Sequence, residues 1–339
     1  MPGQPFDAVL LIAFGGPLGP DDVRPFLANV LRGRRVSPER VEEVAHHYEL
    51  FGGVSPLTAL TNAQAAGLAG RLRARGHDLP VYVGMRNWHP FLSETLAVMA
   101  NDGVRRAVGF IAAAHRSYSS CTQYRENVRD AQAALQRSGL PPIDITYVED
   151  WHGHPQFIEA SADHVEAALA ELPANVRDRA ALIFTAHSIP ASMAAAYPYQ
   201  QQYEESARLI AERVRARTAL PLPAHTVYQS RSGRPEDPWL GPDVCEFLRE
   251  LRGKGVEAVV LCPAGFVCDH IEILYDLDTE AAALCREIGL VMTRARSVND
   301  HPVFVDMMAD VVGRTIQRYA RARPLPVVPA RIQEGSGGF

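Results

Sequence analysis

Short apolar runs alternate with longer amphipathic segments along most of this chain, and that alternation limits the possible folds more than any other feature. An apolar run bounded by turn residues predicts a strand buried on both faces, and an amphipathic segment predicts a helix that covers it. Strands are expected at 8–14, 81–85, 107–113, 143–148, 181–186, 225–229 and 258–262. Helices are expected at 21–32, 38–48, 57–75, 92–102, 123–138, 155–172, 200–218, 243–254, 271–288 and 302–323. This order predicts an α/β fold with parallel sheets flanked by helices.

The chain carries two similar runs that end in histidine, one at His115 and one at His187, and a third, looser version ends at His270. We therefore predict two similar α/β domains followed by a tail. The predicted parts are residues 1–155, residues 156–325 and the tail 326–339. Because ligands of doubly wound sheets bind beyond the carboxyl ends of the strands, the three histidines point to a cleft between the domains.

Composition excludes several classes of protein. The net charge of −5 argues against a nucleic-acid binder held by bulk electrostatics. No run of 18 apolar residues is present, and the N-terminus lacks the features of a secretion signal, so we expect a cytoplasmic protein without transmembrane contact. The 5 cysteines are odd in number and form no C-x-x-C pair, which argues against a disulfide framework or a zinc ribbon. Nucleotide-binding glycine motifs are absent as well.

The segment 269–280 is the strongest candidate for chemistry. On a regular α-helix, Glu272, Asp276 and Glu280 would share one face, with His270 at the entrance. A row of carboxylates suits a divalent cation or a proton path. The alternative is a solvated acidic face, although the apolar residues between the acids favour burial of much of the helix.

Ser55 and His187 each have both a structural and a functional interpretation. Ser55 precedes a helix after a glycine pair, where it could cap the helix or offer its hydroxyl to a carboxylate. His187 stands at a strand end before a proline, where a histidine serves either packing or catalysis.

Six segments, in this order and spacing, resemble the ferrochelatase family. They are LLIAFGGP at 10–17, FGGVSPL at 51–57, YVGMRNWHP at 82–90, AHSIP at 186–190, PWLGP at 238–242 and GFVCDHIE at 265–272. The resemblance implies two Rossmann-like domains around a porphyrin cleft. It also implies a lyase of haem b biosynthesis that inserts Fe²⁺ into a free-base porphyrin.

The resemblance assigns roles to residues of both domains. His187 and Glu272 would face each other across the cleft as the catalytic and metal-binding pair. Asp276 and Glu280 would form an outer relay for protons or hydrated metal. The implied porphyrin-binding residues are Phe14, Ser55, Tyr124 and Arg32.

The substrate expected from the resemblance is coproporphyrin III, as in the high-GC Gram-positive branch of the family. Its four propionates would suit Arg32, Arg34 or Arg35, although a solvated basic turn explains these residues equally well. Protoporphyrin IX is the alternative substrate, and a cobalt or nickel chelatase is an alternative enzyme. An alternative of another class is a haem or porphyrin carrier without catalysis.

The chain departs from the family pattern at two places. Phe14 stands where some relatives have a tyrosine that ligates the product iron. Cys121 matches one ligand of the 2Fe–2S cluster found in some relatives, but no cysteine follows Cys285, so no cluster is expected. We expect no resident cofactor, with Fe²⁺ and porphyrin as substrates. No nucleic acid is expected to bind, and contact with neighbouring haem-pathway enzymes would be transient.

Overall fold

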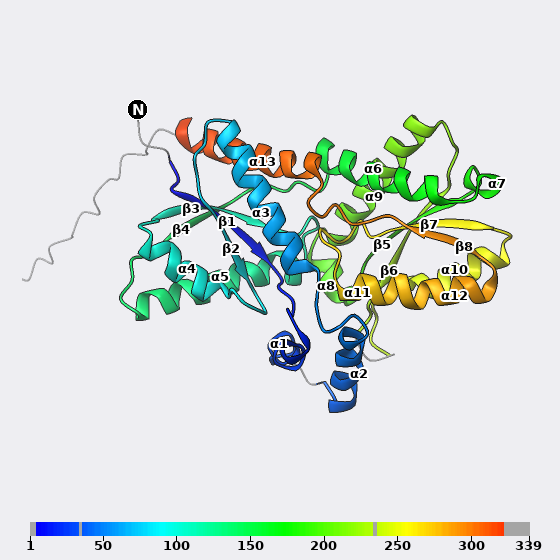
Figure 1. The fold of residues 1–339 in the computed structure, drawn as a ribbon, viewed down its shortest axis with the longest axis horizontal. Coiled ribbons are helices and arrows are strands. Elements are labelled where there is room, and N and C mark those ends of the chain that lie inside the picture. Colours follow the sequence, from blue (N-terminus) through cyan, green and yellow to red (C-terminus); the bar gives the residue numbers. More distant parts are fainter. Residues whose placement is uncertain (1–4, 34–35, 233–235, 322–339) are drawn as a thin grey trace, which may run out of the picture.

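The computed structural model describes residues 5–33, 36–232 and 236–321, which form two four-stranded parallel sheets flanked by helices (Figure 1). The first sheet has the order β2-β1-β3-β4 and the second has the order β6-β5-β7-β8. The strands are β1 (Ala8–Ala13), β2 (Val81–Met85), β3 (Arg106–Ile111), β4 (Asp144–Tyr147), β5 (Ala181–His187), β6 (Ala224–Gln229), β7 (Ala258–Cys262) and β8 (Val291–Arg294). The two sheets have the same strand order, with β5, β6, β7 and β8 in the positions of β1, β2, β3 and β4.

Helices connect the strands as the sequence predicts. In the first half they are α1 (Val23–Val30), α2 (Pro38–Glu49), α3 (Leu57–Ala74), α4 (Leu92–Asn101) and α5 (Gln123–Arg137). The remaining helices are α6 (Pro155–Glu171), α7 (Ala174–Arg177), α8 (Ala191–Ala196), α9 (Tyr199–Thr218), α10 (Val244–Gly253), α11 (Ile271–Tyr275), α12 (Ala282–Ile288) and α13 (Pro302–Arg321). A short 3₁₀ turn, Pro20–Asp22, precedes α1.

The sequence missed strand β8 and the short helices α7 and α8. β8 lies at the edge of its sheet beside β7 and lacks a fully buried side chain, so it carries no apolar run. The two short helices are too brief to display a helical period.

The acidic segment is not the regular helix expected over 271–288. It comprises α11, a π-helical segment at Asp276–Ala281 and α12. A second π-helical segment, Tyr118–Thr122, precedes α5. Because a π-helix bonds residue i to residue i+5, the i, i+4, i+8 alignment of the acids does not hold through this segment.

A continuous apolar core joins the two halves. Leu11, Phe110, Phe157, Phe184 and Phe304 belong to one buried cluster that reaches from the first sheet to the second. Helix α13 lies along the top of the molecule and packs on α3 of the first half and on α6 of the second (Figure 1). The domain boundary at 155/156 stays a prediction, and the tail 326–339 lies outside the described residues.

The remaining clusters complete the layers. One covers the other face of the first sheet beneath α4 and α5, and one covers the second sheet beneath α10 and α12. A small cluster holds α1 and α2 in a lobe below the sheets and includes Ile271 of α11. Across the described ranges, no helix has the length and apolarity needed to cross a bilayer.

Candidate active site

His187 is the last residue of β5 and faces Glu272 of α11. Its Nε2 lies 3.8 Å from Glu272 Oε2, and the side chains are 34% and 47% exposed. Its Nδ1 lies 2.5 Å from the carbonyl oxygen of Ser188. Because that oxygen can only accept, Nδ1 carries a hydrogen, and Nε2 is the ring nitrogen that faces Glu272. The pair can accept a proton or bind a cation.

Close backbone packing fixes the end of β5. Gly265 approaches so closely that an added Cβ would lie 2.4 Å from Ala186 Cβ, and its N–H donates to Thr185 O at 2.9 Å. The hydroxyl of Tyr199 donates to His187 O at 2.9 Å. Only glycine permits the loop after β7 to pack this tightly beside the histidine.

Asp276 lies one turn beyond Glu272 and is held by β6. Gln229 Nε2 donates to Asp276 Oδ2 at 3.1 Å and to Glu272 O at 3.3 Å, and the hydroxyl of Ser230 also donates to Asp276 Oδ2. Burial raises the pKa of Asp276 to about 7; the Ser230 hydrogen bond opposes this rise and the charge of Glu272 adds to it. At neutral pH this carboxyl is therefore poised to take up or release a proton.

Glu280 continues the acidic segment toward α2. Burial and the charge of Asp243 raise its pKa. Arg40 and Glu43 of α2 also act on this carboxyl. The structure thus keeps Glu272, Asp276 and Glu280 on one segment, although a π-helix changes their spacing.

His270 immediately precedes α11, and its ring packs against Phe266 at 4.8 Å. Burial lowers its pKa, which favours the neutral imidazole. Within the described ranges, no three His, Cys, Asp or Glu side chains form a group able to hold a metal ion. The candidate site therefore consists of the His187–Glu272 pair and the acids that follow it.

An aromatic cluster borders this pair on the first half of the molecule. Phe14, one residue after β1, packs on a cluster that includes Phe26, Tyr48, Trp88 and Ile271. Since Ile271 neighbours Glu272, the cluster joins the end of β1 to the acidic segment. Phe14 and His187 end equivalent strands of the two sheets and approach the same segment.

The sequence did not single out Arg86, which follows β2. Its guanidinium lies 5.8 Å from the ring centres of both Phe14 and Tyr124. The ring of Tyr124 is buried, and burial raises its pKa to about 12. A cation thus joins two of the residues that the resemblance assigned to porphyrin binding.

Ser55 and Arg32 lie in different surroundings. Ser55 is buried against Gly16, and its Oγ accepts from Leu57 N at 3.4 Å. Arg32 is exposed, and its Nη2 donates to Asn29 Oδ1 at 2.7 Å. The predicted Arg34 and Arg35 lie outside the described residues. Ser55 and Tyr124 are thus both buried, at 3% and 6% exposure.

Helix α2 contributes two residues that sequence reasoning missed. The ring of His47 stacks on Tyr275 of α11 at 3.5 Å, and burial lowers the pKa of His47. Tyr48 is buried, and its pKa is raised by burial and by the charge of Glu272. The only signal in the sequence was their place on a predicted helix, because the contact with α11 depends on tertiary structure.

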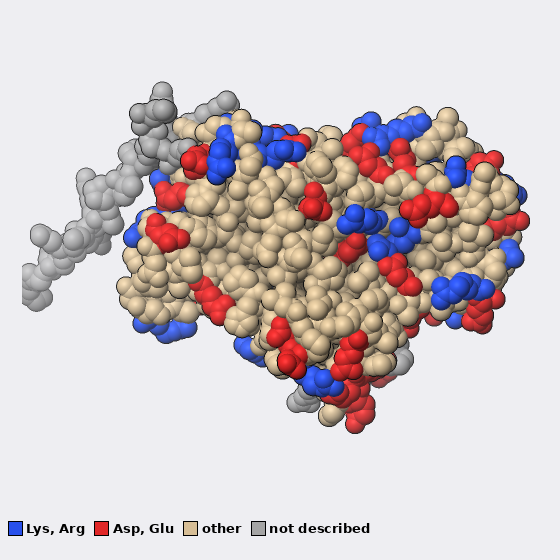
Figure 2. Space-filling model, viewed as in Figure 1, with Lys and Arg blue, Asp and Glu red and all other residues tan. Residues whose placement is uncertain are grey.

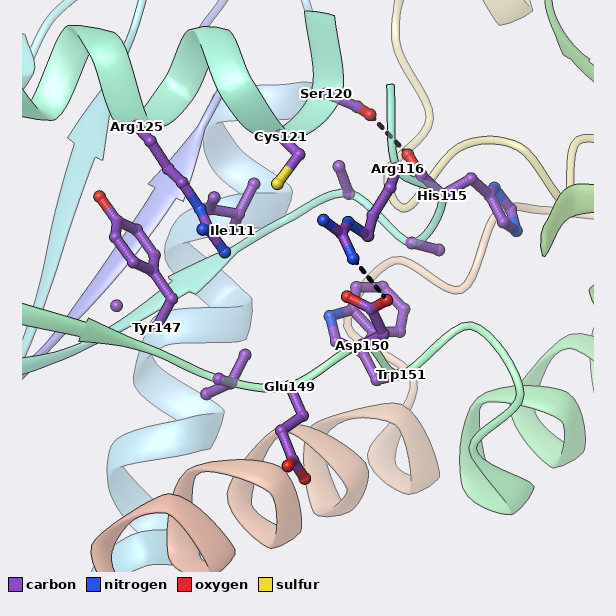
Figure 3. Close-up of a pocket in the computed structure, with 14 residues that line it drawn as sticks. Ile111, His115, Arg116, Ser120, Cys121, Arg125, Tyr147, Glu149, Asp150 and Trp151 are labelled. Carbon is purple, nitrogen blue, oxygen red and sulfur yellow. Dashed lines mark hydrogen bonds and ion pairs between the residues drawn. The ribbon is translucent and has the colours of Figure 1, made fainter. Parts of the chain in front are cut away.

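A separate small pocket lies at the carboxyl ends of β3 and β4 (Figure 3). Its volume is about 40 Å³, and Cys121 Sγ points into it. Arg116 pairs with Asp150 at 3.3 Å, and Arg125 lies over the ring of Tyr147 at 4.6 Å. Cys121 is the one cysteine among the described lining residues.

His115 also lines this pocket through its backbone, but its ring points away (Figure 3). The ring is buried against Ser206 of α9, with Nε2 3.0 Å from Oγ. Burial, aided by His152, lowers the pKa of His115 to about 3. Of the three histidines predicted near strand ends, His115 is therefore a neutral packing residue away from the His187–Glu272 pair.

Charges of both signs intermingle on the face shown in Figure 2, and acidic side chains gather over the lobe of α1 and α2. Exposed carboxylates of α2 include Glu39, Glu42 and Glu43. Arg24 of α1 pairs with Glu42 at 2.6 Å. This lobe lies beside the acidic segment, since α2 packs on α11.

Two parallel sheets with site residues at their strand ends define the chelatase fold class. The sirohydrochlorin chelatase SirB from Bacillus subtilis subspecies spizizenii, solved with cobalt, has a similar fold with a TM-score of 0.53 and 12% identity. The similarity covers 92% of this chain and 95% of that one. A SirB structure from Bacillus subtilis with Fe³⁺ gives a TM-score of 0.55 at 11% identity, over 92% and 96% of the two chains.

The ferrochelatase family model matches residues 6–316, and this chain belongs to that family of lyases. Its relatives include the coproporphyrin III ferrochelatase of Streptomyces coelicolor, 47% identical over 97% of this chain and 90% of that protein. The coproporphyrin III ferrochelatase of Nocardia farcinica is 45% identical over 94% and 90%. The ferrochelatase of Rhodopirellula baltica is 46% identical over 91% and 86%.

Proposed function

We propose that this protein inserts Fe²⁺ into coproporphyrin III to form the iron porphyrin during haem synthesis. The observation that carries the proposal is the His187–Glu272 pair of the second half, 3.8 Å apart, beside the aromatic cluster of the first half that includes Ile271. Several similar proteins, including those of Streptomyces coelicolor and Nocardia farcinica, are named for coproporphyrin III.

We propose that His187 and Glu272 act on the reacting atoms. Two pyrrole N–H protons leave as Fe²⁺ enters, so the reaction needs bases near the ring. The Nε2 lone pair of His187 can accept one proton, and the carboxylate of Glu272 can accept the other or bind the incoming cation. The carbonyl of Ser188 holds the imidazole in the required tautomer.

Asp276 and Glu280 are proposed as the outer relay. A carboxyl with a pKa near 7 exchanges protons readily at neutral pH, which suits the transfer of pyrrole protons to solvent. The same oxygens suit a hydrated divalent cation on its way inward.

Phe14, Tyr124, Ser55 and Arg32 are proposed to contact the porphyrin. Support comes from the position of Phe14 in the cluster beside Ile271 and from Arg86, whose charge lies against both Phe14 and Tyr124. A cation beside two aromatic rings suits a flat macrocycle with carboxylate arms. Phe14 offers no oxygen, so it cannot ligate the iron of the product.

The test is anaerobic Fe²⁺ insertion into coproporphyrin III and protoporphyrin IX side by side, followed by absorbance. A higher kcat/KM for coproporphyrin III is expected. A preference for protoporphyrin IX would reject the proposed substrate and leave the chelatase reaction intact. Tight porphyrin binding without insertion of Fe²⁺ would reject catalysis and favour a carrier, whereas insertion of Co²⁺ or Ni²⁺ alone would reject the proposed metal.

Fe²⁺ is proposed as a substrate and not as a resident metal. The absence of a 2Fe–2S cluster remains a prediction, based on the lack of cysteine after Cys285. The cytoplasmic location and the transient contact with neighbouring haem-pathway enzymes also remain predictions.

A further inference from the structure

The segment 269–278 carries His270, Glu272 and Asp276, and it passes from α11 into the π-helical segment. A π-helix is rare because its extra residue weakens local packing, so its register depends on contacts from outside the helix. A residue outside the helix is therefore needed to fix the position of this segment.

Arg294, the last residue of β8, contacts both ends of the segment. Its Nη1 donates to Asp269 Oδ1 at 3.0 Å. Its Nε and Nη2 donate to the two carboxylate oxygens of Asp278 at 2.6 Å and 2.9 Å. The arginine side chain is 13% exposed, and that of Asp269 is 10% exposed.

Asp269 is tied in turn to the loop after β8 and to the first half of the molecule. It accepts from Asn299 Nδ2 at 2.8 Å, and its own N–H donates to Asn299 Oδ1 at 2.8 Å. Asn299 has a φ of 47°, and its carbonyl accepts from Gln64 Nε2 of α3 at 2.7 Å. The contacts thus run from α3 through Asn299 and Asp269 to Arg294 and the π-helical segment.

We propose that Arg294 is a positioning residue for metal insertion: by holding Asp269 and Asp278 together, it fixes the register that presents Glu272 and Asp276 to the reacting atoms. The inference rests on the proposed roles of Glu272 and Asp276. A planar guanidinium suits this task, because it binds one carboxylate with two hydrogen bonds and still reaches the other, whereas a lysine cannot.

The test compares Arg294→Met with Arg217→Met. Arg217 lies on α9 and pairs with Glu159, Asp163 and Glu166, so its replacement removes a comparable ion-pair cluster away from the site. The readouts are Tm, the Kd for coproporphyrin III from fluorescence, and kcat for Fe²⁺ insertion well below each Tm. We expect Arg294→Met to lower kcat about tenfold or more with a Kd within about twofold, because small displacements of catalytic groups are costly.

Arg217→Met is expected to lower Tm and leave kcat within about twofold. Arg294→Lys should recover less than half of the lost kcat. If Arg294→Met does not fold, Asp278→Asn replaces it, because this side chain is 35% exposed and the change removes its charge and one of the two oxygens that accept from Arg294. Folded Arg294→Met or Asp278→Asn with the kcat of the control overturns the proposal.

A double-mutant cycle separates this proposal from the proposed function. In an Asp276→Asn background, Arg294→Met is expected to lower kcat/KM for Fe²⁺ by a smaller factor than in the wild type, because the two residues act through one arrangement. Where Asp276→Asn alone lowers kcat/KM, equal factors in both backgrounds overturn positioning through Asp276. If Asp276→Asn alone leaves kcat and KM unchanged, the relay fails, while a loss in Arg294→Met still supports positioning of Glu272.

Discussion

His115 and His187 follow similar apolar runs, yet the structure gives them opposite surroundings. His115 is 2% exposed and packs against Ser206 with a pKa lowered to about 3. The His187 side chain is 34% exposed and faces Glu272 at 3.8 Å. The neutral imidazole of His115 stabilises the contact between the segment after β3 and α9, whereas that of His187 is reachable by a ligand.

The difference follows from topology. His187 ends β5, which takes in the second sheet the position of β1 in the first, so its counterpart is Phe14. His115 follows β3, whose end meets α9 of the other half. The local sequence of an apolar run does not show which strand of the sheet it forms. Two similar motifs can therefore have different roles.

The largest expected effect comes from His187→Ala. We expect Fe²⁺ insertion to fall by about 10²–10⁴-fold, because a base and cation ligand is lost. The exposed His89, which pairs with Glu94 at 3.0 Å, supplies the control His89→Ala with near wild-type rates. Turnover retained in folded His187→Ala would remove this residue from the mechanism and abolish the contrast with His115.

Gly265→Ala should disturb the position of His187 through the end of β5. The added Cβ would lie 2.5 Å from Ala186 Cα, so the end of β5 must shift, at a cost of about 1–3 kcal/mol in the free energy of unfolding. We also expect about a tenfold loss of kcat, since His187 moves with the strand. The control is Gly253→Ala, where a Cβ meets nothing within 4 Å. Equal urea stability and kcat in the two variants would contradict this account.

His115→Gln should reduce stability without reducing kcat. We expect a loss of about 1–2 kcal/mol at pH 7 from the altered contact with Ser206. In the wild type the pKa of His115 in the folded state lies below its unfolded value of about 6.5. Below pH 6.5 the unfolded state therefore binds a proton that the folded state does not. Stability therefore falls as pH drops from about 6.5 toward 3, by up to about 1.4 kcal/mol per pH unit.

Glutamine lacks this titration, so the stability deficit of His115→Gln should narrow at pH 5 in urea unfolding. A deficit that stays constant from pH 7 to pH 5 would show that His115 is not buried as a neutral ring. A fall in kcat larger than about twofold would place His115 in the catalytic machinery.

Asp276→Ala is expected to have the smallest effect, chiefly about a tenfold rise in the KM for Fe²⁺. The charged carboxyl attracts the cation, so the wild-type KM should fall as pH rises through about 7, and the variant should lack this change. A loss confined to kcat would indicate proton transfer instead.

The raised pKa of Asp276 also affects stability. Because folding raises this pKa, the contribution of the Asp276 carboxyl to the free energy of unfolding declines as the pH rises above the ordinary pKa of an aspartate. Asp276→Asn lacks this titration, so its stability relative to the wild type should increase at pH 8.

The sequence predicted the elements that carry long patterns. Seven strands and ten helical segments appear close to their expected places, because fully buried strands and amphipathic helices leave a periodic signal. The pairing of His187 with Glu272 followed from the family resemblance, and no period in the sequence indicates a 3.8 Å contact between residues so far apart.

By itself the sequence determined the α/β class, the membership of the ferrochelatase family and the acids near Glu272, since these depend on local pattern and motif order. Tertiary structure alone decided the π-helical register at Asp276, the position of Arg86 between two rings and the burial of His115. The position of Arg86 depends on contacts within the first half, the π-helical register on contacts with β6 and β8 in the second, and the burial of His115 on a contact between the two halves. The sequence of the π-helical segment gives no sign that its register is held by Arg294, which lies on the neighbouring strand β8.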